Sequence, residues 1–229
     1  MIEGFAKEMK LGTKESHSMA ESTSFVKKFL GGVVEEENYR TLVANFYFVY
    51  RALEEQIDRN SDDPIIAPLA KMTELKRVPA LEKDLAYFYG GSWFLDVDPS
   101  DACKTYIDRI LHCNMEELVG HHYTRYLGDL SGGQILKTIA EKALKLDEKG
   151  LAFYKFDIED KKAYKTKYRE TLNTLPLTTA QQNTAITEAN FAFRLNMYMF
   201  DELSGTAKDA WNSAAKVFIQ TMVGAFKKG

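Results

Sequence analysis

The chain has 229 residues, of which 45% are hydrophobic and 28% charged, with a formal net charge of −3. This profile is that of an ordered globular protein, and the slight acidic excess argues against a general nucleic-acid binder, which needs surplus Lys and Arg to meet phosphates. Two cysteines, Cys103 and Cys113, form neither a disulfide framework nor a zinc motif and suit a reducing compartment. Without a basic leader or a long apolar run, we expect a cytoplasmic protein with no membrane anchor.

Hydrophobic periodicity is helical throughout, and no stretch shows the apolar and polar alternation of a half-buried strand. We therefore predict an all-α fold. Glycine pairs and Pro-containing turns divide the chain, in order, into predicted helices at about 10–30, 35–59, 67–76, 79–89, 100–113, 115–146, 158–173, 178–203 and 207–227. No internal repeat or long linker interrupts this series, so we expect one domain over residues 1–229.

Three glycines lie within the long predicted helix 115–146, in the run Gly128 to Gln134. Each glycine costs about 1 kcal/mol relative to alanine in a helix interior, so the cluster indicates backbone that bends or that something approaches closely. A flat ligand such as a porphyrin could lie directly against peptide groups that carry no Cβ. Close packing between helices is the alternative, and the third glycine, Gly133, favours ligand contact over it.

An iron porphyrin needs an axial donor, for which a neutral imidazole is the usual choice. The sequence offers four histidines: His17, His112, His121 and His122. His121 precedes Gly128 by seven residues, about 10.5 Å of helical rise, and one straight helix cannot hold both faces of a flat ligand. His17 lies on a different helix, with Thr13 and Glu21 one turn to either side, so a carboxylate could accept the ring's other N–H. A lone histidine is more often a surface or satisfied core residue. We keep that interpretation for His112, His121 and His122, and only the resemblance described next reverses it for His17.

Two segments carry a resemblance to a known family. Residues 123–134, YTRYLGDLSGGQ, resemble the distal-helix signature of haem oxygenases, and residues 11–17, LGTKESH, resemble their proximal segment. The similarity continues through 51–55, 195–196 and 200–203, and so covers nearly the whole chain. It implies a multi-helix fold with haem between a proximal helix and a glycine-kinked distal helix. The implied reaction cleaves haem at a meso carbon, expected to be alpha, to biliverdin, CO and ferrous iron, with haem as both substrate and cofactor.

The same resemblance assigns roles to individual residues. His17 is the implied iron ligand, Gly128 and Gly132 shape the distal face, and Asp129 holds an ordered water that supports oxygen activation. The remainder of the distal hydrogen-bond network is assigned to Tyr50, Tyr106, Arg125 and Asn196. The propionates are assigned to Lys10, Lys14, Tyr123, Lys165 and Arg169. Further contacts around haem are assigned to Thr13, Glu21, Ser131 and Phe193.

The sequence has no glycine-rich turn between a strand and a helix, so we expect no tightly bound flavin or nicotinamide. Electrons must then come from another protein. Basic residues around the haem edge suit an acidic ferredoxin, a flavin-containing reductase is the second candidate, and a bilin reductase could collect the product. Two alternatives remain. A haem carrier or sensor would keep His17 but has no need of Asp129, and a helical enzyme acting on another small molecule would not bind haem.

Overall fold

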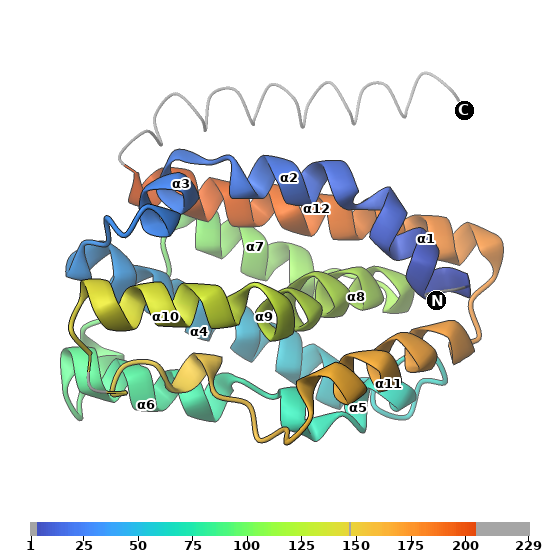
Figure 1. Ribbon diagram of the computed structural model, residues 1–229. Helices are drawn as coiled ribbons and strands as arrows, with labels where there is room; N and C mark the ends of the chain where they lie inside the picture. Colours follow the sequence, from blue (N-terminus) through green and yellow to red (C-terminus); the bar gives the residue numbers. More distant parts are fainter. Residues whose placement is uncertain (1–3, 147, 205–229) are drawn as a thin grey trace.

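The computed structural model describes residues 4–146 and 148–204. Every regular element within those residues is helical and none is a strand, so the all-α prediction is confirmed (Figure 1). The predicted helix at 207–227 lies outside the described residues. None of the helices that the structure describes combines the length and the apolar character needed to cross a bilayer.

Twelve α-helices follow one another along the part of the chain that the structure describes. Their bounds are α1 Gly4–Gly12, α2 Lys14–Glu21, α3 Ser24–Leu30, α4 Glu36–Arg59, α5 Ala67–Ala70, α6 Val78–Tyr89, α7 Asp101–Leu111, α8 Met115–His122, α9 Gly128–Ser131, α10 Gly133–Ala143, α11 Lys161–Thr174 and α12 Thr179–Leu203. A π-helical turn, η3, covers Tyr123–Leu127, and short 3-10 turns cover Thr73–Leu75, Trp93–Leu95 and Ala152–Tyr154. Five predicted helices, α4, α6, α7, α11 and α12, are confirmed to within a few residues at each end.

The prediction of one continuous helix over 10–30 is wrong, because two threonines interrupt it. At Thr13 the backbone leaves helical geometry (φ −106°, ψ 1°), and the side-chain hydroxyl bonds the carbonyl of Met9 at 2.7 Å. At Thr23 the backbone is extended (φ −59°, ψ 151°), and the hydroxyl accepts a hydrogen bond from the N–H of Val26. This bond caps the start of α3. The residues between them form the separate helix α2, which carries His17.

The prediction of one continuous helix over 115–146 is also wrong. Regular α-helix ends at the π-helical turn Tyr123–Leu127 and resumes as α9 at Gly128. The helix therefore departs from regularity next to the glycine run as expected, through a π-helical turn that lies directly before the first glycine. Its end also comes early, since α10 stops at Ala143 and Lys145 has a positive φ of 54°. The helix predicted at 67–76 is reduced to α5 and a 3-10 turn, because Met72 leaves helical geometry (ψ 57°).

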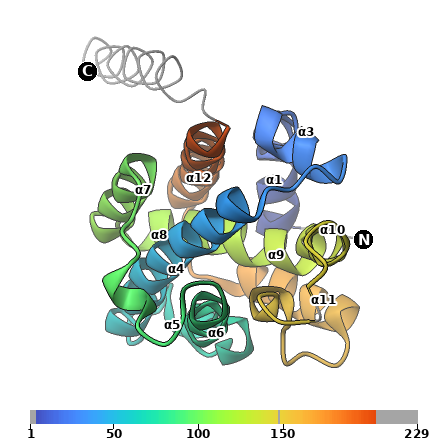
Figure 2. The ribbon, with the colours of Figure 1, turned by 90° about the vertical axis from the view of Figure 1, so that its left-hand side faces the viewer.

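The core forms around α4 and α8. Helix α4 packs against α6 and α7, and α8 packs along α12 more extensively than any other two helices that the structure describes. Figure 2 shows α4 between α5 and α6 on one side and α12 on the other. Gly120 permits the approach of α8 to α12, because a Cβ there would lie 2.6 Å from the carbonyl oxygen of Ala185. This packing fixes the position of α8, which leads through the π-helical turn into the glycine run.

Candidate active site

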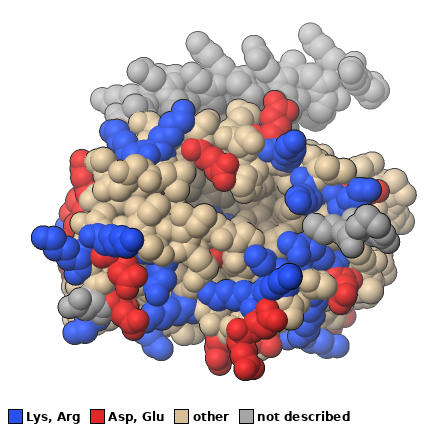
Figure 3. Space-filling model, viewed as in Figure 1, with Lys and Arg blue, Asp and Glu red and all other residues tan. Residues whose placement is uncertain are grey.

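A hollow opens on the face of the molecule drawn in Figure 3. Figure 1, seen from the same side, places α2 above this hollow and α9 and α10 below it. Helix α2 carries His17 and α9 begins with Gly128. The two segments that the sequence singled out thus face each other across open space, although they are far apart along the chain.

His17 keeps one ring nitrogen free. Its side chain is 55% exposed, with Nδ1 lying 3.6 Å from Oε1 of Glu21, one turn along α2. The ring meets the ring of Phe193 edge-on at a centroid distance of 5.6 Å. Nε2 has no partner among the described residues. A carboxylate at Nδ1 favours the tautomer with its lone pair on Nε2, which is the form that binds a metal.

Helix α2 is held on α12 by polar contacts as well as by Phe193. Ser16 donates a hydrogen bond to Oδ1 of Asn190 at 2.5 Å, and Asn190 donates to the carbonyl of Gly12 at 3.0 Å. These bonds fix the imidazole that lies one residue further on. Its position therefore depends on rigid helices rather than on a loop.

Two of the three glycines in the run that faces α2, Gly128 and Gly132, present backbone that no neighbouring side chain covers. A Cβ added to Gly128 would meet nothing within 4 Å, and one added to Gly132 would meet only the carbonyl oxygen of Gly128, at 3.7 Å. Helix packing therefore does not explain the absence of side chains at these two positions. Gly133 is different, since its Cβ would lie 3.4 Å from the ring of Tyr154, and it supports the helix from behind. Ser131, between the first two, is exposed.

Next to the glycines, a group of buried polar side chains brings together residues of four helices and the π-helical turn. The hydroxyl of Tyr50 on α4 donates to Oδ2 of Asp129, and Nε of Arg125 donates to that hydroxyl at 3.0 Å. Arg125 also donates to Oδ1 of Asn196 on α12 and lies 3.6 Å from the second oxygen of Asp129. Tyr106 on α7 is fully buried beside Arg125 and Asn196. The four residues expected to accompany Asp129 are thus brought together.

Burial and charge tune the acidity of this network in opposite directions. Burial raises the pKa of Asp129 to about 6, and Arg125 and Tyr50 limit the rise because both favour the ionised carboxylate. Burial disfavours the charge of Arg125, but Tyr50 and Asp129 outweigh it and raise its pKa. Near neutral pH the site therefore holds an ionised carboxylate locked to a guanidinium, at the edge of bare backbone.

The residues expected to hold the propionates lie on α1, α2, η3 and α11. Burial raises the pKa of Tyr123, while a hydrogen bond with Thr13 and the charge of Arg169 lower it, so both lie close to its hydroxyl. Lys165 and Arg169 are half-buried on α11, which packs mainly along α1. Lys10 and Lys14 are exposed near the junction of α1 and α2. One aromatic hydroxyl and several cations therefore gather along this side of the molecule.

Of the other three histidines, one lies at the surface and two are core residues that each bond through one ring nitrogen. His112 is exposed, and its Nδ1 lies 2.7 Å from the carbonyl oxygen of Asp108. His121 and His122 are buried, with ring nitrogens at 2.8 Å from Glu188 and from Tyr168, respectively. None of the three shares the position of His17 on α2.

Comparison with known proteins decides the family. The model of the family described as "Heme oxygenase" matches residues 3–202. The chain belongs to the haem oxygenase family. It is 48% identical over 233 residues to the heme oxygenase of the alga Porphyra purpurea, covering 100% of this chain and 95% of that protein. It is 49% identical to heme oxygenase 1 of a Nostoc strain, covering 90% and 88%.

Solved structures of haem oxygenases agree with the fold. Heme oxygenase-1 of Synechocystis, determined in complex with heme, superposes with a TM-score of 0.86 at 46% identity, covering 96% of this chain and 100% of that one. Heme oxygenase from Leptospira interrogans superposes with a TM-score of 0.83 at 38% identity, covering 87% and 100%. Since the chain covers most of each haem oxygenase, the similarity is not confined to one motif.

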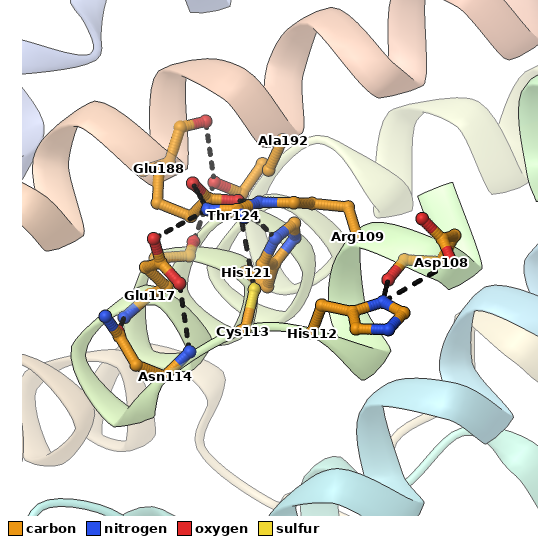
Figure 4. Close-up of polar contacts among 12 residues, drawn as sticks. Asp108, Arg109, His112, Cys113, Asn114, Glu117, His121, Thr124, Glu188 and Ala192 are labelled. Atoms are coloured by element: carbon orange, nitrogen blue, oxygen red, sulfur yellow. Dashed lines mark hydrogen bonds and ion pairs between the residues drawn. The ribbon is translucent and has the colours of Figure 1, made fainter. Parts of the chain in front are cut away.

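A second polar cluster, partly buried, was not predicted from the sequence of this haem oxygenase (Figure 4). Glu188 on α12 accepts two hydrogen bonds from Arg109, at 2.8 and 2.7 Å, and one ring contact from His121 at 2.8 Å. The thiol of Cys113 lies 3.9 Å from the same carboxylate, and Arg109 also binds Glu117 at 2.6 Å. Nothing in the sequence pattern signals this cluster, because Glu188 on α12 is brought to α7 and α8 only by the fold.

The cluster is a structural ion pair rather than a cation site. Cys113, His121 and Glu188 offer ligand atoms within 4.8 Å of one another. However, Arg109 already supplies the positive charge at Glu188, and burial raises the pKa of Cys113, which keeps the thiol neutral. Although burial alone would raise the pKa of Glu188, hydrogen bonds from Arg109 and His121 lower it to about 2. The cluster therefore anchors α8 to α7 and α12.

Proposed function

We propose that this protein binds haem as its substrate in the hollow between α2 and α9 and cleaves it to biliverdin, CO and ferrous iron. The supporting observation is the opposition of a free imidazole, His17, to bare backbone at Gly128 and Gly132. An imidazole with its lone pair available suits iron, and glycine backbone with no neighbour within 4 Å can lie flat against a porphyrin face. Haem supplies the oxygen-binding iron when it is bound.

His17 is the proposed axial ligand through Nε2. The carboxylate of Glu21, 3.6 Å from Nδ1, favours the tautomer that carries its proton on Nδ1, and Phe193 limits the rotation of the ring. Thr13 and Ser131 flank the proposed position of haem on the proximal and distal sides. In this arrangement His17 on α2 would coordinate the iron, and the bare backbone of α9 would set the shape of the opposite face of the site.

Asp129 is proposed to order a water that donates a proton during oxygen activation. Its carboxylate is fixed by Tyr50 and Arg125, so it can accept from a water without itself approaching the reacting atoms. Asn196 holds Arg125 by accepting a hydrogen bond from it, and Tyr106 is buried beside the two. The bare backbone restricts oxygen to one edge of the ring, and we infer that the alpha meso carbon lies at that edge.

The two propionates are proposed to lie toward α1, η3 and α11. Arg169 and Tyr123 can bind one carboxylate, and the ammonium groups of Lys10, Lys14 and Lys165 complete the charge balance. These contacts would fix the rotation of haem within its own plane. They are the part of the proposed site that distinguishes one meso carbon from another.

We propose that an acidic ferredoxin supplies the electrons, because the cations that border the proposed haem edge offer it a complementary surface. A flavin-containing reductase is the alternative donor. A bilin reductase that takes biliverdin directly and a cytoplasmic location complete the proposal, together with a single haem oxygenase domain over 1–229. Replacing reduced ferredoxin by a reductase of neutral surface, at low and high salt, tests the donor: only the ferredoxin reaction should slow steeply with salt.

The rival function is haem carriage or sensing without turnover. Asp129 argues against it, since a carrier gains nothing from a buried carboxylate of raised pKa beside the ligand. The test is to titrate the protein with hemin and then add an electron donor in air. Growth of a biliverdin band at the expense of the haem absorption supports turnover, and an unchanged haem spectrum supports the carrier.

A further inference from the structure

His122 and Tyr168 form a buried bridge between two parts of the proposed site. His122 is the last residue of α8, directly before the π-helical turn, and Tyr168 lies on α11. Nδ1 of His122 lies 2.8 Å from the hydroxyl of Tyr168, and the two rings stack with centroids 5.6 Å apart and an interplanar angle of 10°. Both side chains are buried, so the bond is shielded from water.

The bridge has a particular place in the fold. Tyr168 stands between Lys165 and Arg169, two of the proposed propionate cations. Helix α11 packs mainly along α1 and has no extensive packing with η3 or α9 among the described elements. His122 and Tyr168 therefore provide a direct polar link between the helix that carries these cations and the segment that leads into Gly128.

His122 acts here as a neutral group. Burial lowers its pKa to about 3, and its ring also packs on Tyr126 at a centroid distance of 4.5 Å. Since it is enclosed between α8, η3 and α11, it is placed to hold helices together rather than to touch haem. Tyr168, with no exposed surface, is placed in the same way.

We propose that the hydrogen-bonded pair His122 and Tyr168 is a positioning device that determines which meso carbon is cleaved. This inference rests on the proposed function. The four meso edges of haem differ only in their substituents, so the protein distinguishes them by where it holds the propionates relative to the distal backbone. Two of the proposed propionate cations, Lys165 and Arg169, lie on α11, and the distal backbone lies on α9. The bridge sets the position of one relative to the other, and loosening it lets haem rotate in its plane.

The experiment compares four single variants of the full chain. Tyr168→Phe removes the hydroxyl and keeps the stacked ring, and His122→Leu removes the ring nitrogen that bonds it. His122→Asn keeps an amide that can donate or accept near the position of Nδ1 and is the rescue variant. Tyr164→Phe is the matched control, because Tyr164 is a buried tyrosine one turn earlier on α11 whose hydroxyl bonds Glu74 at 3.0 Å instead.

Two readouts are measured: the biliverdin isomers by chromatography, and the haem methyl resonances of the ferric complex by proton NMR, which report in-plane rotation without turnover. We expect Tyr168→Phe and His122→Leu to lower the ratio of main to minor isomer about fivefold or more, as expected for loss of about 1 kcal/mol of discrimination. Both should also show a second set of methyl resonances. His122→Asn and Tyr164→Phe should resemble the unchanged protein.

Unchanged isomers and a single set of resonances in Tyr168→Phe would overturn the inference while leaving the proposed function intact. The same change in Tyr164→Phe would also overturn it, because the effect would then come from any loosening of α11. A chain that converts no haem at all would instead remove the proposed function itself. The three failures are therefore distinguishable.

Discussion

Tyr50 and Asp129 are 79 residues apart, yet the hydroxyl of the first donates a buried hydrogen bond to the carboxylate of the second. This contact ties the central helix α4 to the first turn of α9, next to the exposed backbone of Gly128. Arg125 completes the triangle through its bond to Tyr50 and its ion pair with Asp129. The carboxylate beside the glycine run is therefore held in one orientation from two sides.

The ionisation of Asp129 should control the pH dependence of turnover. Because its pKa is raised to about 6, the carboxylate is ionised above that pH and protonated below it, so the form that accepts hydrogen bonds is lost as the pH falls. We expect biliverdin formation to rise between about pH 5 and 7, and Asp129→Asn to be about 100-fold slower with that limb absent. Rates measured across this pH range provide the test. An acidic limb that persists in Asp129→Asn would assign it to another group.

Replacing His17 should remove the axial ligand and leave the fold intact, because the side chain is mostly exposed. We expect His17→Ala to lose the nitrogen-ligated haem spectrum and to regain it when free imidazole is added. His112→Ala is the matched control, since His112 is an exposed histidine on another part of the surface. A normal spectrum in His17→Ala without added imidazole would refute the assignment of the ligand.

Replacing Gly128 by alanine should change stability and haem affinity in opposite directions. An alanine there meets no neighbour, so we expect Gly128→Ala to raise the free energy of unfolding of the apoprotein by about 0.5–1 kcal/mol. The same methyl group should lower haem affinity about tenfold or more by occupying space against the ring. Chemical denaturation and hemin titration measure the two effects. A stable variant with undiminished haem affinity would place haem elsewhere.

At Gly120, eight residues earlier, an alanine should destabilise the protein instead of stabilising it. A methyl group at Gly120 would overlap the backbone of α12, where the carbonyl oxygen of Ala185 is 2.6 Å away. We expect Gly120→Ala to lower the free energy of unfolding by roughly 3 kcal/mol, since backbone atoms cannot move aside as a side chain can. Denaturation of the apoprotein checks this value. Equal stability of the Gly120 and Gly128 variants would contradict the packing described for α8 and α12.

The cations of α11 should fix the product isomer. We expect the double variant Lys165→Ala, Arg169→Ala to yield a mixture of biliverdin isomers, because the propionates lose two of their partners. Lys162→Ala, Lys167→Ala is the control, as these lysines lie on the same helix but face solvent. Chromatography of the products separates the isomers. Identical products from both double variants would show that the propionates are held elsewhere.

Hydrophobic periodicity and helix breakers predicted most of the helices, because the formation of a helix depends on residues that are close in sequence. The breaks at Thr13 and Thr23 escaped prediction, since they depend on one hydroxyl each within an otherwise helical pattern. The π-helical turn also escaped, because one wider turn changes the hydrophobic pattern too little to be noticed.

For the site, His17 and the glycines stand out in sequence, and the resemblance to haem oxygenases supplied the remainder of the residues. The sequence alone could not join Tyr50 to Asp129 or His122 to Tyr168, because only the fold brings these pairs together. Nor could it separate Gly133 from the other two glycines. Its role depends on the ring of Tyr154, which reaches it from a loop that follows α10.

The most direct test of this account is the amount of CO and biliverdin released when the protein, loaded with one equivalent of hemin, receives electrons in air. We predict equal amounts of both products, each matching the haem consumed. If oxygen and electrons are consumed while the haem remains intact and no CO is released, the protein is not a haem oxygenase in function, whatever its family.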